Sequence, residues 1–258
     1  MLGLDEIRTF YPETLHRFPR FLLREYLQYK LLEIIYTSPY ANQLCFLGGT
    51  CLRIVHGNQR FSEDLDFDNI RLNGKELNEI TKAIQKGLTR EGYEVEIKQV
   101  MRRAWHCYIR FPGLLYQEGL SGYQEEKILI QLDTEPQEYD YEPEEFILSK
   151  FEVFTTIKTT PPPLLFAQKL FAILKRPRKQ GRDFFDVVYV MGKNIKPDFN
   201  YLKIKANISN PTQLKASILD ICDDLDMKKL AADVEPFLFE PKARDKVVKF
   251  PEYFQQSF

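Results

Sequence analysis

Long hydrophobic runs, internal repeats and low-complexity tracts are all missing from this sequence of 258 residues. No stretch approaches the ~18 consecutive apolar residues of a membrane-spanning helix, and the first 20 residues contain no apolar run of signal-peptide length. An excess of charge is missing too, because 36 Lys and Arg residues oppose 37 Asp and Glu residues. We therefore expect a cytoplasmic protein with no membrane partner, and the charge balance excludes a uniformly basic coat for nucleic acid.

Cysteine and histidine are scarce and scattered. The four cysteines contain no Cys-x-x-Cys pair and the three histidines lie far apart, so no zinc-site spacing is present. Free cysteines are among the most buried residues of proteins, and we expect these thiols to be buried and inert. The remaining composition, 44% hydrophobic and 28% charged, is that of a globular chain with room for one large domain or two small ones.

Hydrophobic periodicity predicts a sheet with helices packed on it in the first part of the chain. Apolar residues spaced by three and four predict helices over residues 21–35 and 77–88, and Thr50 is expected to N-cap a short helix after Gly48 and Gly49. Strand-like runs occupy residues 44–47, 64–67, 94–100, 106–111 and 128–133. This order of helices and strands predicts an α/β (α+β) fold with a mixed sheet and flanking helices.

The composition changes after residue 133. Residues 134–145 carry six acidic side chains and no basic one, which is typical of a solvated loop or linker. Three prolines at 161–163 then mark a boundary, and the pattern after them is helical, ending in an aromatic tail that we expect to pack back on the body. The sequence therefore predicts two domains, residues 1–150 with the sheet and residues 160–258 as a helical region.

The turn at Gly48, Gly49 and Thr50 is the first candidate site. A strand that enters a Gly-Gly turn and then a helix exposes backbone N–H groups with no side chain in the way, which suits a phosphate. The same pattern is common in turns that have only a structural role. The turn is a candidate nucleotide-binding element, and the acids that follow it strengthen this interpretation.

Two acids follow the turn at the spacing of a strand. Asp64 and Asp66 are two residues apart, so on a strand their carboxylates share a face, about 6.5 Å apart along the backbone. Two like charges that close favour a cation between them, and carboxylate oxygens suit Mg²⁺. Asp133 ends a later predicted strand and would add a third carboxylate, enough for two metal ions, if the two strands are neighbours. The alternatives are a solvated strand face for the pair and, for Asp133, the start of the acidic loop.

A run of positive charge and a pair of acids follow the three prolines. Between residues 161 and 182 lie six cations and no acid: Lys169, Lys175, Arg176, Arg178, Lys179 and Arg182. Such a block is typical of a surface that contacts a triphosphate or a nucleic-acid backbone, or of a plain solvated helix face. Lys169 lies at the margin of an apolar helix face, from which it can reach a phosphate. Asp183 and Asp186 are one helical turn apart, and two like charges at this spacing repel each other. Either a cation such as Lys169 or Arg182 lies between them, or both acids simply lie in the first turn of a helix, where the helix dipole stabilises negative charge.

Several of these segments together resemble the AbiEii/AbiGii toxin family, which comprises the nucleotidyltransferase-like toxins of type IV toxin–antitoxin and phage-abortive systems. The resemblance spans about residues 40 to 190 and rests on these motifs: Gly48-Gly49-Thr50-Cys51-Leu52-Arg53, Arg60-Phe61-Ser62-Glu63-Asp64-Leu65-Asp66-Phe67, and Ala167-Gln168-Lys169-Leu170 leading to Arg182-Asp183-Phe184-Phe185-Asp186. The combination of Gly-Gly with Ser-x-Asp-Leu-Asp is quite specific.

The resemblance implies a nucleotidyltransferase core of the DNA polymerase β type, followed by a helical region that closes the cleft. It implies transfer of a nucleoside monophosphate from an NTP to an acceptor hydroxyl, with Mg²⁺ or Mn²⁺ as cofactor and release of pyrophosphate. It assigns triphosphate binding to Gly48, Gly49 and Ser62, metal binding to Asp64 and Asp66, nucleotide contact to Lys169, and a later essential acid to Asp183, with Asp186 as the alternative.

The resemblance also implies partners. The expected acceptor is the 3′ end of a tRNA, the basic segment 175–182 would contact its phosphates, and a cognate antitoxin would be encoded nearby. Three alternatives stay open: the same chemistry on a protein or small-molecule hydroxyl, a regulator that binds NTP without transferring it, and a toxin that acts only by interaction with a partner.

Overall fold

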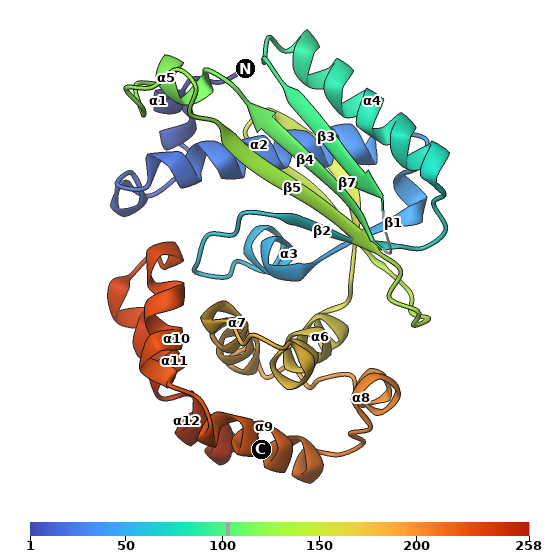
Figure 1. Cartoon of the computed structure of the whole chain (residues 1–258), viewed down its shortest axis with the longest axis vertical. Coiled ribbons are helices and arrows are strands. Elements are labelled where there is room, and N and C mark those ends of the chain that lie inside the picture. Colours follow the sequence, from blue (N-terminus) through green and yellow to red (C-terminus); the bar gives the residue numbers. More distant parts are fainter. Residues whose placement is uncertain (102–103, 258) are drawn as a thin grey trace. The chain divides into compact units, whose positions relative to one another are not determined.

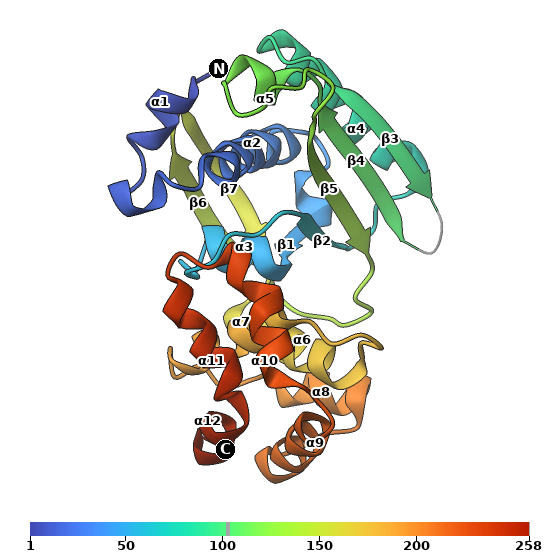
Figure 2. The same ribbon diagram turned by 60° about the vertical axis from the view of Figure 1, so that its left-hand side comes forward.

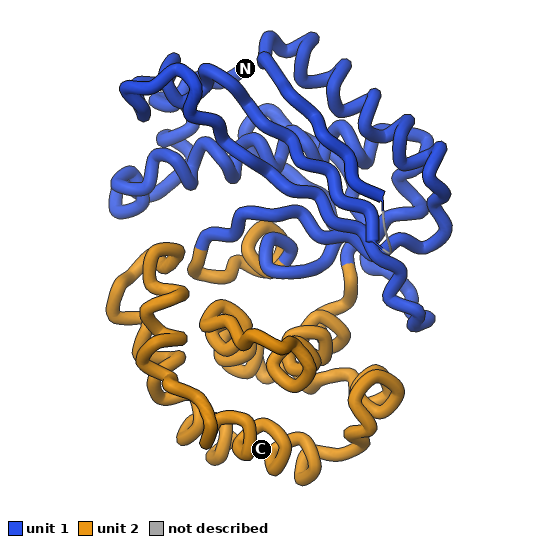
Figure 3. Tube along the Cα trace, viewed as in Figure 1, with its two compact units in different colours: residues 1–51, 61–159 blue, residues 52–60, 160–258 orange. Residues whose placement is uncertain are grey.

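The computed structural model describes residues 1–101 and 104–257 (Figure 1). The chain folds into two compact units (Figure 3): unit 1 comprises Met1–Cys51 and Phe61–Thr159, and unit 2 comprises Leu52–Arg60 and Thr160–Phe258. The chain thus leaves unit 1 after Cys51, returns at Phe61, and leaves again after Thr159. The predicted division into residues 1–150 and 160–258 does not include this early excursion, in which residues 52–60 belong to unit 2.

Unit 1 is built on a mixed sheet. In the described residues the sheet has seven strands in the order β3-β4-β5-β2-β1-β7-β6. The strands are β1 (Leu44–Leu47), β2 (Leu65–Asn69), β3 (Glu96–Met101), β4 (Trp105–Phe111), β5 (Ile128–Glu135), β6 (Glu144–Lys150) and β7 (Val153–Thr159). Neighbours are antiparallel except β2 with β5 and β1 with β7, which are parallel. The predicted mixed sheet is confirmed, and β6 and β7 extend it beyond β1 (Figure 2).

Two long helices carry most of the apolar surface that packs on this sheet. Helix α2 (Pro19–Tyr36) contacts β7 and β5, and α4 (Gly74–Arg90) contacts α2 and β3. The periodic residues of α4 are buried, and each such side chain stabilises the fold by roughly 1.5–3 kcal/mol. Asn73 caps α4 by accepting hydrogen bonds from the N–H groups of Lys75 and Glu76. The shorter helices are α1 (Leu4–Arg8), η1 (Glu13–Leu15), η2 (Ala41–Gln43) and α5 (Leu114–Gln117).

Helix α3 (Gly48–Ile54) follows β1 directly and carries the chain from unit 1 into unit 2. The expectation that Thr50 is its N-cap is wrong, because the helix begins at Gly48 and Thr50 lies inside it. The buried Thr50 hydroxyl instead donates a hydrogen bond to the Asp64 carbonyl oxygen. Thr50 therefore ties the start of α3 to the segment that enters β2.

Unit 2 is helical, as the pattern after the prolines predicts. Its helices are α6 (Pro162–Lys175), α7 (Gly181–Met191), α8 (Phe199–Ala206), α9 (Pro211–Asp223), α10 (Met227–Val234), η3 (Glu235–Phe237), η4 (Pro241–Arg244), α11 (Asp245–Val248) and α12 (Phe250–Ser257). The aromatic tail does pack back: Phe250 and Phe254 are fully buried, and the Phe250 ring meets Phe184 of α7 edge-on at 4.9 Å. The excursion joins this unit through an antiparallel bridge between Arg60 and Leu238.

Two further expectations concern single segments. The acidic segment 134–145 is a loop only in its middle, since its first residues belong to β5 and its last to β6. The four cysteines are all free and buried, which confirms the expectation that they are buried. Across the described residues, no helix has the length and hydrophobicity to cross a membrane.

Candidate active site

The acids of the predicted metal site lie on neighbouring parallel strands of unit 1. Strand β2 pairs with β5, and Asp66 stands opposite Asp133 in the register. The two strands are therefore neighbours, which was the condition for Asp133 to join the pair. Leu65 and Phe67 are buried, so the alternation of the strand directs Asp66 to the other face, and β5 repeats this pattern around Asp133. Asp64 immediately precedes β2 and is two residues before Asp66.

Gly48 lies directly against the Asp66 side chain. Its φ is +81°, a conformation that favours glycine, and a Cβ added there would lie 2.2 Å from Oδ2 and 2.9 Å from Cβ of Asp66. Leu47, the residue before it, is the register partner of Asp66 across β1 and β2. A glycine is therefore required at this position if the Asp66 carboxylate is to lie against the start of α3.

Asp133 is held by two side chains of the same sheet. His106 of β4 is its cross-strand partner, with Nδ1 2.7 Å from Asp133 Oδ1. Gln131 Nε2 donates to both carboxylate oxygens, at 2.8 and 2.9 Å. These contacts fix the orientation of the Asp133 carboxylate, which stays about one-third exposed.

The segment that leads into β2 is tethered to α2. Gln28 Nε2 donates to the carbonyl oxygens of Ser62 and Glu63, at 3.0 and 2.9 Å. Arg24 of the same helix forms an ion pair with the Glu63 side chain at 2.5 Å. Together with the Thr50 hydroxyl, these contacts fix the backbone on which Ser62 and Asp64 stand.

The acids of unit 1 fit a magnesium ion by donor chemistry. Asp64, Asp66 and Asp133 offer hard carboxylate oxygens, and Mg²⁺ completes its shell with water and substrate phosphate oxygens rather than with a full set of protein ligands. Within the described residues, no three His, Cys, Asp or Glu side chains are grouped closely enough to enclose a metal. Mg²⁺ at these acids would therefore take much of its coordination shell from water and substrate phosphate oxygens.

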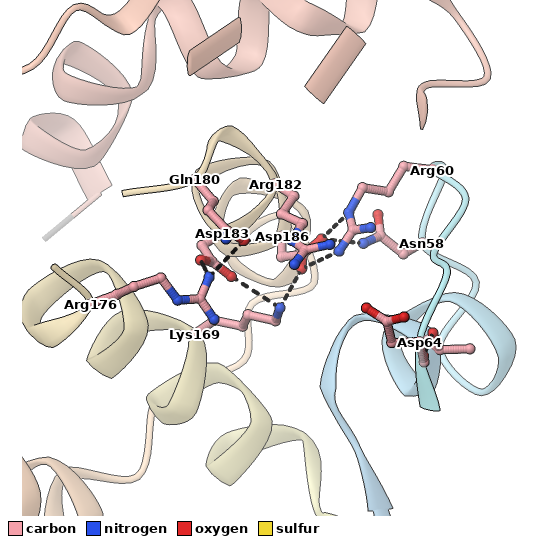
Figure 4. A network of polar contacts seen from close by, with 10 residues as sticks. Asn58, Arg60, Asp64, Lys169, Arg176, Gln180, Arg182, Asp183 and Asp186 are labelled. Carbon is pink, nitrogen blue, oxygen red and sulfur yellow. Dashed lines mark hydrogen bonds and ion pairs between the residues drawn. The ribbon is translucent and has the colours of Figure 1, made fainter. Parts of the chain in front are cut away.

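Unit 2 holds a second polar cluster, centred on Lys169 of α6 and the acids of α7 (Figure 4). Lys169 Nζ lies 3.2 Å from Asp183 Oδ1 and 2.8 Å from Asp186 Oδ2. Of the cations named as candidate partners of these two acids, Lys169 is the one that joins them. Arg182 instead donates from Nε to the Gln180 side chain at 2.7 Å.

Asp186 is the most enclosed member of this cluster. It is 0% exposed, and it accepts hydrogen bonds at 2.7 Å from Arg60 Nε, Arg60 Nη2 and Asn58 Nδ2 (Figure 4). Burial alone would raise the pKa of Asp186, but the positive charges of Arg60 and Lys169 outweigh it and lower the pKa to about 2. Asp186 is therefore ionised, and it anchors the excursion 52–60 to α7.

Sequence reasoning missed the roles of Arg60 and Asn58. Arg60 is 1% exposed, and a fully buried arginine requires a counter-charge. Its partner Asp186 lies 126 residues away in the sequence, so no local spacing could reveal the pair. The one available signal was Arg60 at the start of the motif that contains Asp64.

The basic segment 175–182 is only partly a free positive surface. Lys175 and Arg178 are exposed, whereas Arg176 forms an ion pair with Asp183. Lys179 Nζ donates to the carbonyl oxygens of Leu174 and Arg176, at 3.2 and 2.8 Å, and so caps the end of α6. Burial, with the nearby Arg176 and Lys175, lowers the pKa of Lys179. The interpretation of six uncompensated cations is therefore wrong for Lys169 and Arg176.

The structure thus distributes the predicted site residues over the two units. Unit 1 contains Gly48, Gly49, Thr50, Ser62, Asp64, Asp66 and Asp133; unit 2 contains Lys169, Lys175, Arg176, Arg178, Lys179, Arg182 and Asp183. Within unit 1, Gly48 meets Asp66 and Asp66 faces Asp133; within unit 2, Lys169 meets Asp183.

The fold of this chain is similar to that of solved structures. JHP933 from Helicobacter pylori shares 16% identity and a TM-score of 0.57, over 92% of this chain and 91% of that chain. A candidate nucleotidyltransferase from H. pylori shares 17% identity and a TM-score of 0.57, over 92% of this chain and 94% of that chain. At these identities the likeness is one of fold alone.

The family follows from the sequence match. Residues 30–246 match the family described as "Nucleotidyl transferase AbiEii toxin, Type IV TA system". The match covers most of the chain, so the chain belongs to the AbiEii family, the nucleotidyltransferase toxins of type IV toxin–antitoxin systems, and the resemblance of its motifs is confirmed. No curated protein sequence matches this chain.

Proposed function

We propose that this protein transfers a nucleoside monophosphate from an NTP to an acceptor hydroxyl in a reaction that depends on Mg²⁺ or Mn²⁺. The observation that carries the proposal is the pairing of Asp66 with Asp133 on adjacent parallel strands, with Gly48 against the Asp66 carboxylate. Carboxylates on one sheet face beside a glycine turn are the parts needed to hold a metal–triphosphate complex.

In this proposal Asp64, Asp66 and Asp133 hold the metal. The bound ion would neutralise charge on the triphosphate and orient its phosphates. Gly48 keeps the space beside Asp66 clear of a side chain, and Gly49, Thr50 and Ser62 line the triphosphate. His106 and Gln131 hold the Asp133 carboxylate in one orientation, so less reorganisation is needed when substrate binds.

The reaction itself is an in-line exchange at the α-phosphorus. The acceptor oxygen forms a bond to the α-phosphorus, the bond from that phosphorus to the bridging oxygen breaks, and pyrophosphate leaves while the hydroxyl proton is released. Catalysis then depends mainly on positioning and on electrostatic stabilisation by the carboxylate-held metal and the cations.

Lys169 and Asp183 have supporting roles in the proposal. An ammonium group has three N–H donors, and in the described residues Lys169 directs two of them to Asp183 and Asp186. A third donor is available to a phosphate oxygen of the nucleotide. Asp183, which also binds Arg176, would hold Lys169 in place for that contact.

We propose the 3′ end of a tRNA as the acceptor, in the cytoplasm, with a cognate antitoxin encoded nearby. The support is membership of the AbiEii family, together with the exposed Lys175 and Arg178 at the end of α6. These two side chains, more than the engaged Arg176, Lys179 and Arg182, suit contacts with RNA phosphates.

The test is a screen with four α-labelled NTPs, total tRNA and Mg²⁺. The expected result is label in RNA with the wild-type protein and none with Asp64→Ala. Label in protein but not in RNA would show that the acceptor is wrong while leaving the transfer chemistry intact. If the protein is toxic when expressed in cells but transfers label to no acceptor in the screen, the proposed transfer is refuted.

A further inference from the structure

Two hollows of unit 2 lie on either side of one tyrosine. The first, of about 740 Å³, lies between α7, the junction of α11 with α12, and Gln59. The second, of about 670 Å³, lies between the end of α7, the chain that follows it, and the end of α12. Tyr253 of α12 lines both. We call the two hollows together the Tyr253 groove.

Positive charge prevails in the Tyr253 groove. Lys193, Lys246 and Lys249 line the first hollow and Lys196 lines the second, and all four are exposed. Two acids, Asp245 and Glu252, also line the first hollow. Four cations against two acids favour an anionic ligand, in a chain whose overall charge is −1.

Aromatic rings stand beside these lysines. Tyr253 is 37% exposed, an unusual degree for a large ring on a helix whose Phe250 and Phe254 are fully buried. Tyr189 of α7 lines the first hollow, and its hydroxyl donates to the His56 carbonyl oxygen at 2.5 Å, which fixes the ring. The groove thus offers flat apolar faces as well as cations.

We propose that the Tyr253 groove binds single-stranded nucleic acid. Lysines would contact successive phosphates, and the Tyr253 ring would stack with bases on either side, the combination by which single strands are bound without sequence preference. Two hollows that share one aromatic ring would let a chain of nucleotides continue from one hollow into the other, past the ring. The site goes beyond the proposed transfer, because binding here involves no metal, no NTP and none of the carboxylates of β2 and β5.

The test measures binding of a labelled ten-nucleotide single-stranded RNA by fluorescence anisotropy, without metal or NTP, over a range of salt concentrations. The groove variant is Lys193→Ala with Lys249→Ala, and the matched control is Lys203→Ala with Lys228→Ala, exposed lysines on α8 and α10. The groove variant should bind more weakly. The salt slope, which is the slope of the logarithm of the binding constant against the logarithm of the salt concentration, should become smaller in magnitude by about 1.4, because each phosphate contact on a single strand contributes about 0.7. The control should bind as the wild type does.

Tyr253 gives the second arm. Tyr253→Ala should weaken binding at least about fivefold, the smallest loss expected when one stacked base is lost, while Tyr253→Phe, which keeps the ring, should stay within about twofold of the wild type. The thermal unfolding midpoint of each variant reports whether it is folded. If Tyr253→Ala is not folded, the salt slope of the groove variant carries the test.

Three results would overturn the proposal. One is an unchanged salt slope in the groove variant, which would place RNA elsewhere, for instance on Lys175 and Arg178. Another is equal affinity of the Phe and Ala variants of Tyr253 for the RNA, whether both bind more weakly than the wild type or neither does. The third is displacement of the RNA by ATP at the concentration at which unlabelled RNA displaces it, which would identify a mononucleotide site. Failure of the transfer assay leaves this binding test unaffected, so the two proposals fail separately.

Discussion

Breaking the buried ion pair between Asp186 and Arg60 should destabilise unit 2 strongly, because it leaves a buried charge without its counter-charge. Asp186→Asn keeps the shape of the side chain but removes the charge that faces Arg60 at 2.7 Å and Lys169 at 2.8 Å. Removing one partner of a buried pair costs about 3–5 kcal/mol, because the other charge stays buried. Lys169 keeps Asp183 as a partner, so we expect the lower end, about 3 kcal/mol, of a total stability of about 5–15 kcal/mol.

Urea unfolding followed by far-UV circular dichroism measures this loss, because unit 2 is helical. Trp105, the single tryptophan, lies on β4 and reports on unit 1 by its fluorescence. The matched control is Asp220→Asn, an exposed acid on α9, which should change stability by less than about 0.5 kcal/mol. A loss below about 1 kcal/mol for Asp186→Asn would refute the reasoning about the buried pair.

Asp186 and two close-packed glycines, Gly48 and Gly181, give further measurable effects. Because the pKa of Asp186 falls from 3.8 to about 2 on folding, its contribution of about 2 kcal/mol is present above pH 4 and lost as the pH drops toward 2, so acid unfolding of the wild type should be steeper than that of Asp186→Asn. Gly48→Ala should lower nucleotide transfer at least about tenfold, because the new Cβ would lie 2.2 Å from Asp66 Oδ2 and displace that carboxylate. Gly181→Ala should destabilise the protein by about 1–3 kcal/mol in thermal unfolding, because its Cβ would lie 1.8 Å from the Leu230 carbonyl oxygen.

Gly122→Ala is the common control for both glycine variants. In the described part of the chain no atom lies within 4 Å of its Cβ, and its φ is not in the left-handed region. It should leave transfer unchanged and shift stability by less than about 0.5 kcal/mol. Full transfer by Gly48→Ala would contradict the place given to Asp66, and an unshifted melting midpoint for Gly181→Ala would contradict the close packing of α7 on α10.

Much of the fold could be predicted from local periodicity, because a helix or strand that buries one face has apolar residues at regular spacing along the sequence. The spacing of three and four located α2 and α4, and the alternation around Asp66 and Asp133 indicated which face each carboxylate takes. Strand β6 escaped prediction because its exposed and buried residues do not alternate cleanly. Its first residues are acidic, which made the segment look like a loop.

Long-range pairing was out of reach of the sequence. That Asp66 faces Asp133 depends on which strands become neighbours, and it could be stated only as a condition. Lys169 and Arg176 have no acidic residue near them in the sequence, so local spacing could not show that they are paired with acids. In the folded chain α7 packs on α6 and supplies Asp183 and Asp186 to those cations.

The most direct test of the central claim follows the two ends of the NTP in one reaction. Wild-type protein with Mg²⁺ and acceptor RNA is supplied with either α-labelled or γ-labelled NTP, and the same reactions are run with Asp66→Asn and with EDTA. The α-label should enter the acceptor and the γ-label should leave as pyrophosphate, and both signals should be lost with Asp66→Asn or EDTA. Transfer of the γ-label to the acceptor, or full α-transfer by Asp66→Asn, would contradict it.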